Sequence, residues 1–121
     1  MFDISSNDII SMPRGDTFTM PIIINIGDDL YFEHYELKDE DLLYFGLCEP
    51  NQPFEQAILR KVFNKDSEKD ENGDTLLHFF PQDTVNLIPG KYYYTIKLRR
   101  DEDDVEKVDT IVNKKLFWIW G

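Results

Sequence analysis

The stretch from Asp83 to Leu98 constrains the fold of this chain more than any other segment. It contains Pro89-Gly90, which predicts a turn because proline presets φ and glycine accepts a positive φ. After this turn, side chains of two kinds alternate. One face carries Tyr92, Tyr94, Ile96 and Leu98, and the other carries Lys91, Tyr93, Thr95 and Lys97. This period of two predicts a half-buried antiparallel strand.

The arrangement of Asp83, Leu87, Gly90, Tyr92 and Tyr94 resembles the E–F corner of immunoglobulin-like sandwiches. In that corner, a tyrosine near the start of strand F donates a hydrogen bond to nearby backbone. The resemblance implies that Tyr92 makes a buried hydrogen bond of this kind, beside the turn that Gly90 supplies. It makes Gly90 and Tyr92 the expected structural corner of the fold.

Other segments also have the pattern of strands separated by turn residues. They are Thr17–Ile26, Leu30–Leu37, Leu42–Glu49, Phe54–Phe63, Thr75–Phe80 and the region from Val108 to Trp120. A short helix over Phe54–Leu59 and a bulge are alternatives in the fourth of these, because its alternation is imperfect. The count of about seven strands at short spacing predicts an all-β fold, an immunoglobulin-like antiparallel β-sandwich.

Local signals refine this prediction. Pro21 cannot donate to a strand ladder, which favours an edge position or a break in the first long strand. Asn72-Gly73 predicts a turn within a polar hairpin loop over 64–74. A second acidic loop is expected over Arg99–Glu106, and a turn or bulge near Asn113–Lys115.

The chain of 121 residues is long enough for one domain with its own core. We expect a single domain over 1–121, in which 1–12 form an extended or flexible N-terminal arm. Cys48 is the only cysteine, so no intramolecular disulfide can form, and its apolar surroundings in sequence predict a buried, inert thiol. The N-terminal residues lack a signal-peptide pattern and no apolar run reaches membrane-spanning length, so we expect synthesis and folding in a cytoplasm.

The formal net charge is −11, from 24 acidic and 13 basic residues. Such a balance argues against nucleic-acid binding, which requires clustered lysine and arginine. It favours solubility and discourages aggregation through strand edges. An acidic inhibitor that mimics nucleic acid is the third functional hypothesis.

No catalytic, cofactor or metal site is predicted. Arg14-Gly15-Asp16 spells an integrin-binding tripeptide but is interpreted as a structural turn. The loop Asp66–Asp74 has part of a calcium-binding pattern, but the position of the bidentate glutamate falls on Phe79. His34 and His78 have no further ligands at zinc-site spacing.

The C-terminal residues Phe117, Trp118 and Trp120 are the predicted interface. Both faces of this strand are apolar, and exposed indoles are enriched at protein interfaces. The alternative, that Trp118 and Trp120 form the core face, stays open at this point. Exposed aromatic rings also bind sugars, so a carbohydrate-binding module with Trp118, Trp120 or Tyr93 as stacking platforms is the second functional hypothesis.

Three segments resemble small virion proteins of tailed bacteriophages, namely Met12–Phe18, Tyr44–Pro50 and Asp83–Tyr94. They are similar to the immunoglobulin-like N-terminal domain of phage baseplate upper proteins, and Asp109-Thr110-Ile111 to Phe117 matches the closing strand of that group. The resemblance covers most of the chain from Met12 onward.

The resemblance implies a non-enzymatic structural or adaptor subunit of a phage particle, located in the virion and made in the cytoplasm of a bacterial host. A head fibre, decoration, baseplate or tail component would each fit. The expected partners are other virion proteins and further copies of the chain, as a homo-oligomer, with no nucleic acid, membrane or cofactor.

Overall fold

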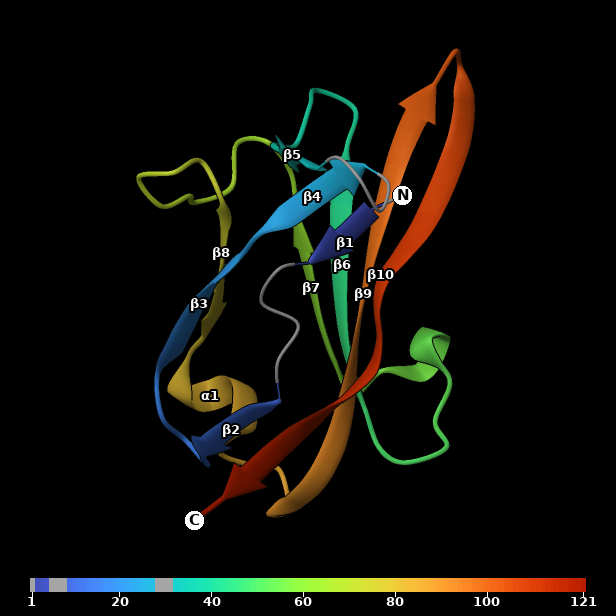
Figure 1. Ribbon diagram of the computed structural model, residues 1–121. Helices are drawn as coiled ribbons and strands as arrows, with labels where there is room; N and C mark the ends of the chain where they lie inside the picture. Colours follow the sequence, from blue (N-terminus) through green and yellow to red (C-terminus); the bar gives the residue numbers. More distant parts are fainter. Residues whose placement is uncertain (1, 5–8, 28–31) are drawn as a thin grey trace.

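Strands dominate the computed structural model, which describes residues 2–4, 9–27 and 32–121. The described strands are β1 (Phe2–Ile4), β2 (Ile10–Pro13), β3 (Phe18–Ile22), β4 (Ile24–Gly27), β5 (Phe32–Tyr35), β6 (Leu42–Cys48), β7 (Leu59–Phe63), β8 (Thr75–Phe79), β9 (Gly90–Glu102) and β10 (Val105–Trp120). The helical elements are a 3-10 turn, η1 (Phe54–Gln56), and a short helix, α1 (Pro81–Thr84). These strands form several sheets, which confirms the prediction of a mainly β fold (Figure 1).

The largest sheet has five strands in the order β2-β10-β9-β6-β7. Its neighbours are antiparallel except for β2 and β10, which run parallel and pair Ile10 with Phe117. β9 and β10 are the longest described strands, and their linked ends project beyond the rest of the sheet (Figure 1). β2 and β7 therefore form the two edges of this sheet.

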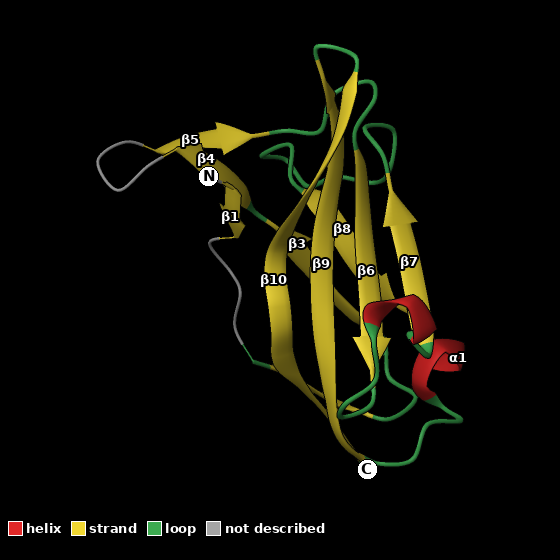
Figure 2. Cartoon of the chain, turned by 90° about the vertical axis from the view of Figure 1, so that its right-hand side faces the viewer, coloured by secondary structure: helices red, strands yellow, loops and turns green. Residues whose placement is uncertain are grey.

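Two smaller sheets contain the remaining strands. β3 pairs with β8 in one, and β1-β4-β5 is the order of the other. The β3–β8 pair lies behind the five-stranded sheet in Figure 2. The first long strand of the sequence is divided between the two smaller sheets at Ile23, two residues after Pro21. Pro21 itself lies in a two-stranded sheet, where each strand is an edge, as its missing N–H predicts.

Aromatic rings join the two layers. Phe79 on β8 contacts Phe45 on β6 and Phe117 on β10, with ring centroids 5.5 and 5.2 Å apart. Tyr94 on β9 stacks on Phe45 at 5.8 Å, and Phe18 on β3 lies 6.2 Å from Phe79. Edge-to-face and offset contacts of this kind stabilise a core beyond the area that they bury. The core thus sits between the five-stranded sheet and the β3–β8 pair.

The turn before β9 has the geometry that the sequence predicts for a tyrosine corner. The Tyr92 hydroxyl donates a hydrogen bond of 2.5 Å to the carbonyl oxygen of Ile88. Tyr92 is buried, and burial raises the pKa of its hydroxyl, so it stays protonated as a donor. Gly90 has φ of +158°, and a Cβ there would meet no other atom within 4 Å. The Tyr92 hydroxyl thus connects β9 to the turn that precedes it.

Two parts of the N-terminal arm expected over 1–12 are extended and belong to strands, whereas residues 1 and 5–8 lie outside the described residues. β1 pairs with β4, and β2 pairs with the C-terminal end of β10. Ile10 and Met12 are buried in the core because β2 directs alternate side chains inward. Local sequence patterns predict a short strand poorly when its partner is far away in the chain.

Two loop predictions also need correction. The segment 64–74 is not a hairpin loop between neighbouring strands, because β7 and β8 belong to different sheets. Gly73 does make a turn there, with φ of +83°. Most of Arg99–Glu106 is strand, and the chain reverses at Asp103-Asp104 alone.

Candidate functional site

The outer face of the five-stranded sheet carries the predicted interface tryptophans. Trp118 and Trp120 are each 48% exposed, whereas Ile119 between them is fully buried. Alternation along β10 thus directs both indoles away from the core. This decides between the two alternatives that the sequence left open for these residues.

The third predicted interface residue, Phe117, lies in the core instead. It is 0% exposed and packs against Phe79 and Tyr94. Phe117 has the opposite parity to the tryptophans, so it supports the face from beneath and offers no surface to a partner.

The tryptophans lie beside the edge strand β2. Ser11 is in register with Trp118, and its hydroxyl oxygen accepts a hydrogen bond of 3.1 Å from the Trp120 indole N–H. On the other side of β10, Trp118 is in register with Lys91 of β9. We call Ser11, Pro13, Trp118 and Trp120 the tryptophan face; it joins exposed aromatic surface to a strand edge.

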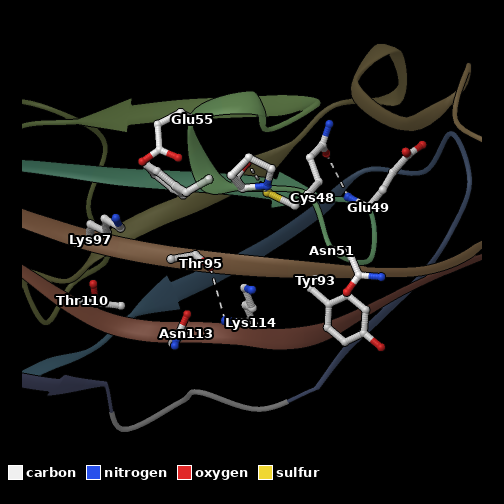
Figure 3. A pocket seen from close by; sticks show the side chains of 13 residues that line it. Cys48, Glu49, Asn51, Glu55, Tyr93, Thr95, Lys97, Thr110, Asn113 and Lys114 are labelled. Carbon is white, nitrogen blue, oxygen red and sulfur yellow. Dashed lines mark hydrogen bonds between the residues drawn. The ribbon is translucent and has the colours of Figure 1, made fainter.

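A groove of about 360 Å³, lined by both polar and apolar side chains, lies farther along the same side of the sheet. Its floor comes from β9 and β10, and its wall comes from the end of β6 and the loop over 49–55 (Figure 3). Tyr93, one of the predicted stacking residues, lines it, but Trp118 and Trp120 do not. Tyr93 therefore belongs to a different candidate site from Trp118 and Trp120.

Phe54 holds the wall of the groove in place. A Cβ on Gly46 would lie 2.6 Å from its ring, so the absence of a side chain at Gly46 lets Phe54 lie against the sheet. The ammonium group of Lys97 sits 4.7 Å from the centre of the Phe54 ring, within cation–π range. These contacts keep the loop close to the sheet.

Cys48 lies in the groove wall with a buried thiol, which donates to the carbonyl oxygen of Pro53 at 3.7 Å. Burial raises the pKa of the Cys48 thiol, so it is protonated at neutral pH. A protonated thiol is a poor nucleophile, which agrees with the predicted inert cysteine.

The floor of the groove contains the bulge that the sequence predicts near Asn113–Lys115. Register shifts occur on both sides of Val112, and Lys114 has φ of +53°. The Lys114 backbone N–H donates to the Thr95 hydroxyl oxygen at 3.3 Å. Local sequence patterns predict a turn or bulge here but not the groove that it forms with Asn51 and Tyr93, because these residues come from separate segments.

Arg14-Gly15-Asp16 forms a turn between β2 and β3. The Arg14 N–H donates to the Trp120 carbonyl oxygen at 2.6 Å, and the Gly15 N–H donates to the hydroxyl oxygen of buried Thr84 at 2.8 Å. Gly15 has φ of +80°, which glycine adopts without strain. These contacts assign the tripeptide a structural role.

The acidic loop over 66–74 makes hydrogen bonds within itself and to neighbouring strands. One carboxylate oxygen of Asp70 accepts from the N–H groups of Asn72 and Asp74, both at 2.9 Å. Asp74 in turn contacts the His34 imidazole at 2.5 Å. Within the described residues, no group of three or more histidine, cysteine, aspartate or glutamate side chains is arranged to hold a metal ion.

The two histidines lie in separate places. His34 on β5 contacts Asp74, and this hydrogen bond raises the pKa of the His34 imidazole. His78 on β8 lies between the Thr19 hydroxyl at 2.8 Å and the Glu68 carboxylate at 2.9 Å. Each histidine thus links its strand to the acidic loop over 66–74, His34 through Asp74 and His78 through Glu68.

No helix in the described ranges is long and apolar enough to cross a membrane. Comparisons with protein-family models, with curated proteins and with solved structures found no match to this chain.

Proposed function

We propose that this chain is a non-enzymatic structural or adaptor subunit of a bacteriophage particle, built as an immunoglobulin-like sandwich that assembles through its tryptophan face. A head fibre, decoration, baseplate or tail component would fit this role. The partners are further copies of the chain and other virion proteins, without nucleic acid, membrane or cofactor. The protein is made in the cytoplasm of the bacterial host and ends in the virion.

The strand order supports the immunoglobulin-like part of the proposal. In variable-type domains, strands G, F, C and C′ are neighbours in one sheet, and B and E pair in the other. β10-β9-β6-β7 and β3–β8 have the same two orders. The hydrogen bond from Tyr92 to Ile88 also lies where these sandwiches have their tyrosine corner.

Two of the segments that carry the phage resemblance are in contact. Met12–Phe18 includes the turn at Gly15, and Asp83–Tyr94 includes Thr84. The hydrogen bond from the Gly15 N–H to the Thr84 hydroxyl oxygen, 2.8 Å long, joins them. Two parts of the pattern that lie 69 positions apart in the sequence are thus in direct contact in the fold.

The observation that carries the proposal is the exposure of Trp118 and Trp120 on one face beside the edge strand β2. Tryptophan is one of the residue types enriched among those that dominate binding energy at interfaces. The acidic residues elsewhere, through the net charge of −11, would oppose association in other orientations.

The virion assignment is tested on particles grown from the phage that encodes the chain. Particles banded in a density gradient are analysed by quantitative mass spectrometry against the major capsid protein. We expect a constant copy ratio between this chain and the capsid protein across independent preparations. A chain that stays in the soluble lysate and is absent from banded particles would contradict the proposal.

A further inference from the structure

The groove beside Tyr93 has the features of a binding site for a small, neutral ligand. We propose that it binds a saccharide, through the ring of Tyr93 and the polar side chains of Asn51, Thr110 and Asn113. This inference is independent of assembly through the tryptophan face, because neither tryptophan lines the groove.

Size comes first. The groove, about 360 Å³, falls at the lower end of the range of small-molecule sites. It is bounded by the loop over 49–55 on one side and by β9 and β10 on the other (Figure 3). A space of this size suits one or two sugar rings.

The polar groups of the groove match hydroxyl groups in particular. Asn51 and Asn113 carry amides, and Thr110 carries a hydroxyl, so each of these side chains both donates and accepts hydrogen bonds. Sugar hydroxyls also do both. Tyr93 adds an aromatic ring, whose face can cover the C–H side of a sugar. In Figure 3, Asn51 and Tyr93 lie at one end of the groove, and Thr110 and Asn113 lie toward the other.

Charge favours a neutral ligand over an ion. Glu49 and Glu55 line the groove together with Lys97 and Lys114, so acidic and basic groups balance. The attraction and repulsion that these four groups exert on a single ion offset each other, so neither an anion nor a cation gains a net electrostatic advantage in the groove. The balance stands out in a chain with a net charge of −11.

Backbone conformation points to the same place. Among the described non-glycine residues, four have a positive φ, and two of these, Asn51 at 65° and Lys114 at 53°, line the groove. The other two, Asp103 and Asp104, form the tip of the β9–β10 hairpin. Strained residues of this kind cluster at ligand sites, where the rest of the fold holds them in position.

The test is an NMR titration of the amide-labelled full chain. The saccharide probes are glucose, galactose, rhamnose, N-acetylglucosamine and the β-linked disaccharides of these sugars. Glutamate and inorganic phosphate serve as charged comparators. We expect at least one saccharide to shift the amides of Asn51, Tyr93, Asn113 and Lys114 saturably, and the charged probes to leave them unchanged.

Variants then connect binding to the groove. Asn113→Ala should weaken binding about 3- to 10-fold, as for one lost hydrogen bond, and Tyr93→Ala should weaken it further. Asn86→Ala is the matched control, because Asn86 is exposed and does not line the groove. Its affinity should equal that of the unmodified chain.

Three results would each overturn the proposal. The first is the absence of a saturable shift with every saccharide. The second is a set of shifts confined to residues outside the groove, such as Trp118 and Trp120. The third is an equal response to glutamate or phosphate, which would show that the groove selects charge and not hydroxyl groups.

Discussion

At the scale of single residues, the hydroxyl of Tyr92 makes a hydrogen bond whose effect on stability can be measured by itself. It donates to the Ile88 carbonyl oxygen from a buried position. Replacing Tyr92 with phenylalanine removes the donor and leaves this carbonyl without that bond. We expect Tyr92→Phe to lower the free energy of unfolding by about 1 kcal/mol or more, measured by urea denaturation.

Tyr93→Phe is the matched control for this substitution. Tyr93 lies next in the same strand but is only half-buried on the outer face. Its replacement should change stability much less. If Tyr92→Phe has an unchanged denaturation midpoint, the tyrosine-corner assignment is wrong.

His34 predicts a pH dependence. The hydrogen bond to Asp74, with the nearby charges of Asp74, Glu36 and Asp70, raises the pKa of His34 above 6.5, although burial acts in the opposite direction. The protonated imidazole is therefore favoured in the folded state. Its contribution to stability is fully present below the unfolded pKa of about 6.5 and is lost as the pH rises through the higher folded pKa.

The measurement is the urea midpoint as a function of pH for the unmodified chain and for His34→Gln. The difference between the two should shrink as the pH rises from below 6.5 to alkaline values. His78→Gln controls for general effects of histidine loss. A constant or growing difference would show that the His34–Asp74 contact does not depend on protonation.

At the scale of elements, the β9–β10 hairpin extends through charged residues that the sequence suggests are a loop. Arg99 contacts Glu106, and Arg100 contacts Asp109, each at 3.0 Å across the two strands. Cross-strand pairs of opposite charge stabilise a ladder that single-strand patterns do not reveal. This explains why the acidic loop expected over Arg99–Glu106 shrinks to a two-residue turn.

The two aspartates of that turn can be replaced by residues that suit its backbone conformation better. Asp103 and Asp104 have φ of 54° and 62°, and a positive φ at both central residues is typical of a type I′ turn. Asn-Gly is the preferred pair for this turn. We expect Asp103→Asn with Asp104→Gly to raise the free energy of unfolding by about 0.5–1 kcal/mol in thermal or urea denaturation.

The Asp104→Ala variant tests whether the positive φ at position 104 affects the stability of the turn. Alanine adopts a positive φ at a cost of roughly 1–2 kcal/mol, so this variant should be less stable than the unmodified chain. The account of the turn would be contradicted if the alanine variant were as stable as the Asn-Gly variant.

Gly46 controls how the groove wall packs. Its substitution by alanine would place a methyl group 2.6 Å from the Phe54 ring. We expect Gly46→Ala to destabilise the chain by about 1–3 kcal/mol, as overpacking does. Calorimetry of Gly46→Ala, Phe54→Leu and the double variant measures the coupling between the two positions.

The smaller leucine side chain should relieve the contact in the double variant. Gly46→Ala should therefore cost less in the Phe54→Leu background than in the unmodified chain. Strictly additive effects would mean that the Phe54 ring is not what requires glycine at this position.

The strands with strict alternation are the part of the fold that sequence patterns predict well. The buried faces of β8 and β9 and the bulge in β10 follow from local periodicity and from turn chemistry. Sheet membership does not follow from them. β2 joins β10 across most of the chain, and β7 and β8 diverge into different sheets, because pairing depends on contacts between distant segments.

At the scale of the whole molecule, the candidate sites were predictable to different degrees. Trp118 and Trp120 stand out in the sequence, but Phe117 and Ile119 are equally apolar, so only the packed sheet shows which pair faces outward. The groove has no sequence signal of its own. Asn51, Tyr93 and Asn113 are ordinary polar or aromatic residues until the fold brings three separate segments together.

The outer side of the five-stranded sheet thus carries two different surfaces. The tryptophan face presents two indoles beside a strand edge, which suits a macromolecular partner. The groove is small and has a mixed polar and apolar lining, which suits a small ligand. Substitutions in one should leave the other unaffected, since they share no residue. This separation lets assembly and ligand binding be measured independently.

The mass of the purified chain in solution, measured by light scattering over a concentration series, tests assembly through the tryptophan face most directly. We expect a defined dimer or higher oligomer that becomes monomeric in the Trp118→Ser, Trp120→Ser variant. The Val105→Ser, Val108→Ser variant, which replaces equally exposed apolar residues on the hairpin, should keep the oligomer. A chain that remains monomeric at every concentration, or an oligomer unaffected by loss of both tryptophans, would contradict this account.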